Sequence, residues 1–196
     1  FMGNIIAIAQ TNIKRMLGFS TIAHMGFIVF GLMTVSVEGI SSALFYTVTY
    51  VITALAGFGV ITMLSRGNYE CESIDDLKGL SRTHPVYAGI ILLVMFSMAG
   101  IPPLVGFYAK FKILDALIVM GYTKTAIYAV VMSLIGAFFY LRIVKIIYFD
   151  DNIIELRTAD ISFIARAVLI INGLLLLIIG IIPSGAIRFC LELITS

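Results

Sequence analysis

Long uninterrupted apolar runs constrain this chain more than any other feature. A helix needs about 20 apolar residues to cross the roughly 30 Å hydrocarbon core of a membrane. Such runs recur along the 196 residues, of which 61% are hydrophobic and 12% are charged, with a mean hydropathy of +1.09. A soluble domain carries about 25% charged residues, so this chain has too little charge to cover a water-facing surface. The sequence therefore predicts an all-α, polytopic transmembrane helical bundle.

Polar residues and prolines divide the apolar runs into segments. The predicted spans cover about residues 16–35, 40–64, 86–101, 103–120, 126–147 and 165–183. Residues 1–9 resemble the end of a span cut off upstream, so we expect a single transmembrane domain that is a fragment of a longer chain. The polar stretch 69–83 predicts a loop or a short interfacial helix, in which Ser73 is the N-cap and Asp76 completes a capping box.

Several function classes are excluded by composition and spacing. The net charge is +2 without a basic run, so there is no electrostatic footprint for binding nucleic acid. Cys71 and Cys190 stand far apart and outside any metal-binding spacing, so we expect no metal or redox centre in this chain. The phosphate-loop, dinucleotide-binding and hydrolase motifs of soluble enzymes are absent from the sequence.

Lys110 is the residue that most needs an explanation. It follows Pro103 by seven residues, or roughly 10 Å along a helix, which places it within the hydrocarbon. A lysine near the bilayer centre costs roughly 2.5–3.5 kcal/mol, so such residues usually face a bundle interior or a hydrated cavity. Desolvation disfavours the ammonium form, so this lysine can release a proton, whereas an arginine stays charged. The alternative is a lysine whose head reaches the membrane surface.

The segment before Lys110 predicts a broken helix. Gly100, Pro102, Pro103 and Gly106 interrupt the apolar run, and prolines remove backbone donors that a helix requires. We expect local unwinding that leaves carbonyl groups facing water or an ion. A plain turn between two spans is the alternative.

Lys112 and Asp115 need a separate interpretation. Lys112 is turned about 200° from Lys110 around a helix, so the two lysines cannot share a face. Lys112 and Asp115 are three residues apart, and this spacing predicts an ion pair on the helix surface.

Two further residues are second-rank candidates for carrying protons. His24 lies within the first full span, and an imidazole titrates near neutral pH; the alternative is a packed histidine hydrogen-bonded across helices. Lys14 is either a candidate relay or, with Arg15, an ordinary flanking charge at the membrane surface. In the next span, polar side chains either line a hydrated path or bond between helices. They are Tyr46, Thr47, Thr49, Tyr50 and Thr53.

Three segments resemble a known family. QTNIKRMLGFSTIAHMGF at 10–27, SMAGIPPLVGFYAKF at 97–111 and FFYLR at 138–142 resemble, in the same order, signatures of the antiporter-like membrane subunits of respiratory complex I. Within that family, a lysine in the broken helix and the absence of charge between Ser42 and Leu64 make the chain most similar to the C-terminal part of subunit N.

The resemblance implies a fold and a role for particular residues. The family folds as two inverted five-helix repeats, each with one discontinuous helix, and this chain would hold the second repeat plus a final helix. Lys110 would accept a proton from a central hydrophilic axis and release it towards the outlet. His24 and Lys14 would belong to that axis, and Gly100, Pro102, Pro103 and Gly106 would keep the helix open.

The resemblance also implies partners and a location. The chain would be a non-redox, proton-translocating subunit of NADH:quinone oxidoreductase, a translocase that is not catalytic alone. Other membrane-arm subunits and the lipid bilayer would surround it, in the bacterial inner membrane rather than the mitochondrial one. It would bind no cofactor itself, because NADH, FMN, iron–sulfur clusters and quinone belong to partner subunits. The alternatives are a subunit of a multisubunit Na⁺/H⁺ antiporter or membrane-bound hydrogenase, and a structural bundle whose charges only fix helix packing.

Overall fold

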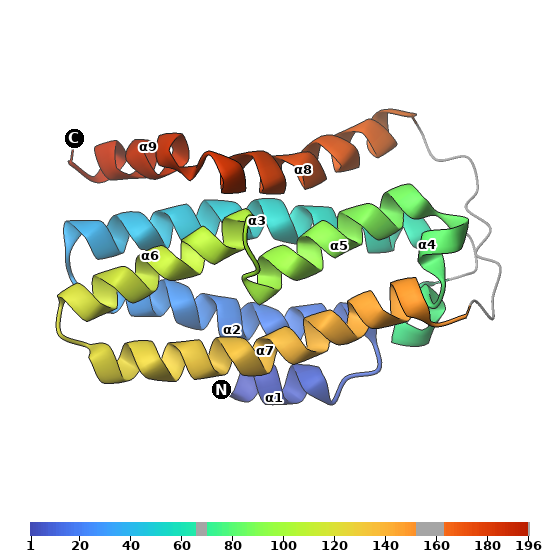
Figure 1. The fold of residues 1–196 in the computed structure, drawn as a ribbon, viewed down its shortest axis with the longest axis horizontal. Helices are drawn as coiled ribbons and strands as arrows, with labels where there is room; N and C mark the ends of the chain where they lie inside the picture. The colour runs from blue at the N-terminus through green and yellow to red at the C-terminus, as the bar shows by residue number, and fades with distance from the viewer. Residues whose placement is uncertain (66–69, 152–162, 196) are drawn as a thin grey trace.

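The computed structural model describes residues 1–65, 70–151 and 163–195, and these residues form helices joined by short connections. The elements are α1 (Met2–Ile8), α2 (Ile13–Met33), α3 (Val37–Leu64), the 3₁₀ turn η1 (Ile74–Leu77), α4 (Leu80–Thr83), α5 (Pro85–Ala99), α6 (Val105–Val119), α7 (Thr123–Phe149), α8 (Phe163–Ile181) and α9 (Pro183–Thr195). The long helices lie side by side along the longest axis of the molecule (Figure 1). The prediction of an all-α transmembrane bundle is confirmed.

Among the residues that the structure describes, four helices are long and apolar enough to cross a membrane, namely α2, α3, α7 and α8. Their outward faces are also apolar. Leu55 on α3 is 61% exposed and Leu134 on α7 is 68% exposed, although neither side chain gains anything from contact with water. A helix that is apolar all round is typical of a membrane span, where the outer face meets lipid.

Helices α5 and α6 have 15 residues each, which is about 22 Å of helix and too short to cross the hydrocarbon alone. They meet end to end in the middle of the bundle, so that together they make one crossing (Figure 1). The two spans predicted at 86–101 and 103–120 are therefore the halves of the predicted broken helix.

The polar stretch before α5 closes one end of the bundle. Ser73 accepts from the Asp75 amide, and its own amide donates to the Asp76 carboxylate, so the predicted capping box is present. Backbone hydrogen bonds tie this stretch to the start of α2: the Ile13 amide donates to the Glu72 carbonyl at 2.7 Å. The predicted helix start at Pro85 is also observed.

Helix α9 is an element that the sequence analysis did not predict. It begins at Pro183, directly after α8, and continues along the same edge of the bundle (Figure 1). It packs on α3, where Cys190 is buried. Because only one side of α9 is apolar, it lacks the long continuous apolar run by which the spans were recognised.

Candidate functional site

The site begins with two carbonyl groups that the break leaves without helical donors. In a continuous α-helix, the amides of residues 102 and 103 would donate to the carbonyls of Met98 and Ala99. Both positions are prolines, which carry no N–H. Gly100 ends α5 in the left-handed conformation, with φ of 85°, and turns the chain away from the helix axis. The predicted unwinding is observed.

Lys110 supplies the missing donor. Its Nζ donates to Met98 O at 2.8 Å and to Ala99 O at 3.1 Å, and a third bond of 2.8 Å reaches Ser133 Oγ on α7. A cation is also favoured at this place because the C-terminal end of α5 carries the negative end of the helix dipole. The lysine head is thus held at the break and does not extend to the membrane surface.

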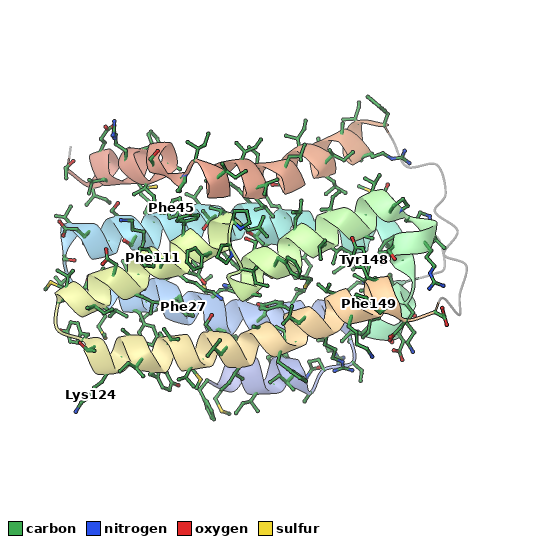
Figure 2. The ribbon with its side chains drawn as sticks, viewed as in Figure 1. Phe27, Phe45, Phe111, Lys124, Tyr148 and Phe149 are labelled. Carbon is green, nitrogen blue, oxygen red and sulfur yellow. The ribbon has the colours of Figure 1, made fainter. Side chains whose placement is uncertain are left out.

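The surroundings of Lys110 contain aromatic and apolar groups rather than an opposite charge. The ammonium lies 5.6 Å from the centre of the Phe27 ring, which occupies the middle of the bundle (Figure 2). No carboxylate of the described residues forms an ion pair with Lys110. Its positive charge is therefore balanced only by dipoles, an arrangement that leaves the lysine free to lose its proton without stranding a buried anion.

Gly106 lets α6 begin close against α5. A Cβ at this position would overlap the carbonyl oxygen of Ser97, and the Gly106 amide donates to Ser97 Oγ at 3.2 Å. On the other side of the break, the backbone of Gly180 on α8 lies so close that a Cβ there would overlap the carbonyl oxygen of Pro103. The break is therefore enclosed by backbone on two sides.

His24 lies beside Lys110, buried between three helices. Its Nδ1 is 2.8 Å from the Tyr46 hydroxyl on α3, and its Nε2 is 2.9 Å from the Tyr140 hydroxyl on α7. The Tyr50 ring packs on the imidazole with 4.8 Å between ring centres. A neutral imidazole has one donor and one acceptor nitrogen, so one tyrosine donates to His24 and the other accepts from it.

Two small cavities join these residues, each about 10 Å³ in volume and lined by His24, Met98 and Lys110. The first extends towards Tyr46, Thr49 and Thr53 of α3. The second extends towards Asn4 of α1 and Ser133 and Tyr140 of α7. This volume is about what one water molecule requires, and polar groups line both spaces. Lys110 and His24 thus face the same two places where water can sit.

Polar side chains of α3 both line a cavity and bond to a neighbouring helix, which are the two interpretations left open by the sequence. Tyr46, Thr49, Tyr50 and Thr53 line the first cavity. Tyr46 and Tyr50 also bond to α2, since the Tyr50 hydroxyl donates to Thr21 Oγ1 at 2.6 Å. Thr47 does neither, because it donates to the Ala43 carbonyl of its own helix.

Lys14 lies apart from this cluster. It is ten residues before His24, or about 15 Å along α2, near the end of the bundle closed by the polar stretch. Its Nζ is 3.4 Å from carboxylate oxygens of both Glu70 and Glu72, and all three side chains are at least partly exposed. The structure brings Lys110 and His24 together with the broken helix, but it does not bring Lys14 to them.

The predicted ion pair between Lys112 and Asp115 is wrong. Within the described residues, no ion pair joins them. Both side chains instead line a cavity of about 160 Å³, together with Glu38 at the start of α3. A space of this size has room for water that would solvate both charges, so there would be little gain in bringing them into contact.

Sequence reasoning missed three polar residues of the site. Ser133 binds Lys110, Tyr140 binds His24, and Asn4 lines the second cavity while donating to the Met132 carbonyl at 2.6 Å. A polar residue in an apolar run is the signal that marks all three in the sequence, but it does not reveal the partner. In residues 1–65, 70–151 and 163–195, no group of His, Cys, Asp or Glu side chains is placed to hold a metal ion.

Comparison with known proteins places this site in a family. Residues 1–139 match the family model described as the transmembrane part of NADH:quinone oxidoreductase and Mrp antiporters. NADH-quinone oxidoreductase subunit N of Laribacter hongkongensis is 55% identical over 192 residues, which cover 97% of this chain and 40% of the relative. The chain thus spans about two-fifths of the length of such relatives, and it matches their C-terminal part.

Solved structures show the same fold. A chain of respiratory complex I from Thermus thermophilus with bound aureothin is 29% identical, with a TM-score of 0.83 over 95% of this chain and 42% of that one. A chain of the Mrp complex from Dietzia sp. is 19% identical, with a TM-score of 0.88 over 100% of this chain and 44% of the other, and this likeness concerns the fold alone.

The family match over residues 1–139 includes the segments at 10–27 and 97–111 and the break beside which Lys110 lies. The relatives are bacterial, and the four apolar spans fit a multi-pass protein of the bacterial inner membrane. The chain belongs to the NADH:quinone oxidoreductase/Mrp antiporter membrane family, and within that family it is most similar to subunit N.

Proposed function

We propose that this chain carries one half of a proton path in a membrane subunit of NADH-quinone oxidoreductase. The single observation that supports this most is the position of Lys110, whose Nζ is held by Met98 O at 2.8 Å in the middle of the bundle, beside cavities with room for water. Lys110 is the group that takes up and releases the proton. Gly100, Pro102, Pro103 and Gly106 maintain the break that receives it.

His24 is the nearest titratable group through which a proton reaches or leaves Lys110. Both residues line the same two cavities, each with room for about one water molecule, so we expect water in these cavities to connect them. The tyrosine hydroxyls on either side of the imidazole fix its ring and extend the row of exchangeable protons. Lys14 would join this path only through groups that lie between the end of the bundle and His24.

The remaining chemistry lies elsewhere in the complex. The chain itself carries out no redox step, and NADH, FMN, iron–sulfur clusters and quinone are bound by other subunits. Its partners are the other membrane-arm subunits and the surrounding lipid. Oxidation of NADH would supply the free energy that drives the proton through this subunit.

Substitutions of Lys110 in the full-length subunit, within the assembled complex, test this function. Lys110→Ala and Lys110→Arg should both lower proton pumping per NADH oxidised in sealed vesicles, because neither side chain cycles between charged and neutral forms. Lys124→Ala is the matched control, since Lys124 is exposed and points away from the bundle at the start of α7 (Figure 2). Full pumping with arginine would exclude a deprotonation cycle, and full pumping in Lys110→Met would favour the purely structural alternative.

A second candidate is a subunit of a multisubunit Na⁺/H⁺ antiporter. The observation that supports this candidate is the likeness in fold to a chain of the Dietzia Mrp complex, with a TM-score of 0.88. In that case the same lysine would serve, but transport would depend on Na⁺ and would not require NADH. Pumping by the purified complex in Na⁺-free buffer, driven by NADH, distinguishes the two.

A further inference from the structure

We propose that Ser133 is a positioning residue for Lys110, which holds the lysine nitrogen in place both before and after proton release. The inference rests on the proposed function, because it concerns the same lysine. Ser133 lies on α7, and its Oγ is 2.8 Å from Lys110 Nζ. The other two partners of Nζ are the backbone carbonyls of Met98 and Ala99, at 2.8 and 3.1 Å.

The chemistry of the three partners differs in one respect. An ammonium has three N–H donors, and the two carbonyls and the hydroxyl oxygen accept one each. When one N–H bond breaks, its electron pair stays on nitrogen, and the neutral amine then has two N–H donors and one lone pair. A carbonyl can only accept, whereas a hydroxyl can also donate. Ser133 is thus the partner that can satisfy the lone pair, by turning its O–H towards it.

The position of Ser133 also fits this role. Its side chain lines the second cavity, which is about 10 Å³ in volume and reaches from Lys110 towards Tyr140 and Asn4. The proton released by Lys110 passes to water in this space, and the Ser133 hydroxyl then donates to the lone pair of the neutral amine. No covalent bond of Ser133 changes in the cycle. The serine therefore keeps the nitrogen of the neutral lysine at the break, ready to accept the next proton.

Several titratable groups face Lys110 and contribute to the pH dependence of the same step. They are His24 on α2, Tyr46 and Tyr50 on α3 and Tyr140 on α7, which line the two cavities beside it. Among described residues, α5 and α8 place no titratable side chain in either cavity. A substitution of Ser133 leaves all four of these groups in place, so a changed pH profile can be assigned to the lysine and its hydroxyl partner.

The test compares Ser133→Ala with Ser133→Thr in the full-length subunit of the assembled complex. Thr47→Val is the matched control, because the Thr47 hydroxyl bonds only within α3. Proton pumping per NADH oxidised is measured in sealed vesicles from pH 6 to 9. We expect Ser133→Ala to lower pumping several-fold. Because hydrogen bonds to a charged group are the stronger ones, the alkaline limb of its profile should move to lower pH by about half to one unit. Ser133→Thr, which keeps the hydroxyl, should restore both the rate and the profile.

The outcomes separate this inference from the proposed function. A wild-type rate and profile in Ser133→Ala would overturn the inference, and so would equal defects in the alanine and threonine variants, which indicate packing alone. If Lys110→Met abolishes pumping while Ser133→Ala has no effect, the role of Ser133 is contradicted and the proposed function is not. If Lys110→Met pumps normally, the proposed function itself is contradicted. Should Ser133→Ala not assemble, Ser133→Cys keeps the volume with a weaker donor and should show a smaller shift in the same direction, and a wild-type profile there would also overturn the role.

Discussion

Nε2 of His24 lies 2.9 Å from the hydroxyl of Tyr140, a bond that joins α2 to α7 across 116 residues of sequence. Tyr46 occupies the other ring nitrogen at 2.8 Å, so the imidazole is fully paired although it is buried. A histidine held in this way has a fixed ring orientation, which depends on the two tyrosines, and in either neutral tautomer one hydroxyl donates to the ring while the other accepts from it.

Removing one of the two tyrosine hydroxyls should therefore destabilise the subunit. Tyr140→Phe leaves a buried ring nitrogen without its partner, at a cost of about 1–3 kcal/mol, and should lower both the thermal stability of the subunit and its pumping. The control is Tyr128→Phe, since Tyr128 lies on the same helix but is 44% exposed. Thermal denaturation midpoints of the purified complexes measure the effect. Equal midpoints for the two variants would contradict the importance of this bond.

A methyl group at Gly100 should disturb the break. Gly100 has φ of 85°, and a Cβ there would lie 3.1 Å from Cδ of Lys110. Gly100→Ala therefore strains the backbone by about 1–2 kcal/mol and displaces the lysine from its carbonyl partners. Gly89→Ala, in the helical part of α5 with open space around it, should assemble as well as the wild type. Complex yield and pumping per NADH are the measurements. Normal pumping in Gly100→Ala would show that Lys110 functions without its present position against the Met98 and Ala99 carbonyls.

Lys14 offers a test of how far the proton path extends. Its ion pairs with Glu70 and Glu72 are 3.4 Å long and exposed to solvent, which screens them, so they contribute little to stability. Lys14→Ala should therefore change stability little and leave pumping within about twofold of the wild type. Pumping reduced as strongly as in Lys110→Ala would instead place Lys14 in the path.

Cys71 should resist thiol reagents. It is buried in the polar stretch that closes the bundle, and burial raises the pKa of its thiol to about 12. Because the thiolate is the reactive form and only about one thiol in ten thousand is ionised at pH 8, labelling should be slow there, and its rate should rise about tenfold per pH unit until near pH 12. Thr83→Cys, at an exposed position nearby, is the control. Mass spectrometry of maleimide-treated complexes gives the extent of labelling, and rapid modification of Cys71 at pH 8 would contradict its burial.

The parts of the site that were predictable from sequence are those with a local cause. Prolines at 102 and 103 and a glycine at 100 mark the break because each changes the backbone at its own position. Lys110 is conspicuous because a charge in an apolar run has few acceptable places. The capping box at Ser73 depends on residues three apart in the chain.

The rest depends on contacts between distant residues. Nothing near Ser133 indicates that it meets Lys110, and nothing near Lys14 indicates that Glu70 and Glu72 return to it. The expected pair of Lys112 and Asp115 failed for a related reason. Helical spacing brings two side chains within reach, but such a pair contributes only about 0.2–0.5 kcal/mol, so the 160 Å³ cavity beside them decides the outcome.

The close approach of Gly180 to Pro103 has a mechanical consequence. At this contact two backbones meet with no side chain between them. Because no side chain there can change its rotamer to make room, a change in the tilt of α8 must displace the residues around Pro103. Strain applied to the outer edge of the bundle is thereby transmitted to the carbonyls that hold Lys110. A bulkier residue at 180 would act as a wedge, and it would alter proton affinity at a position that it never touches.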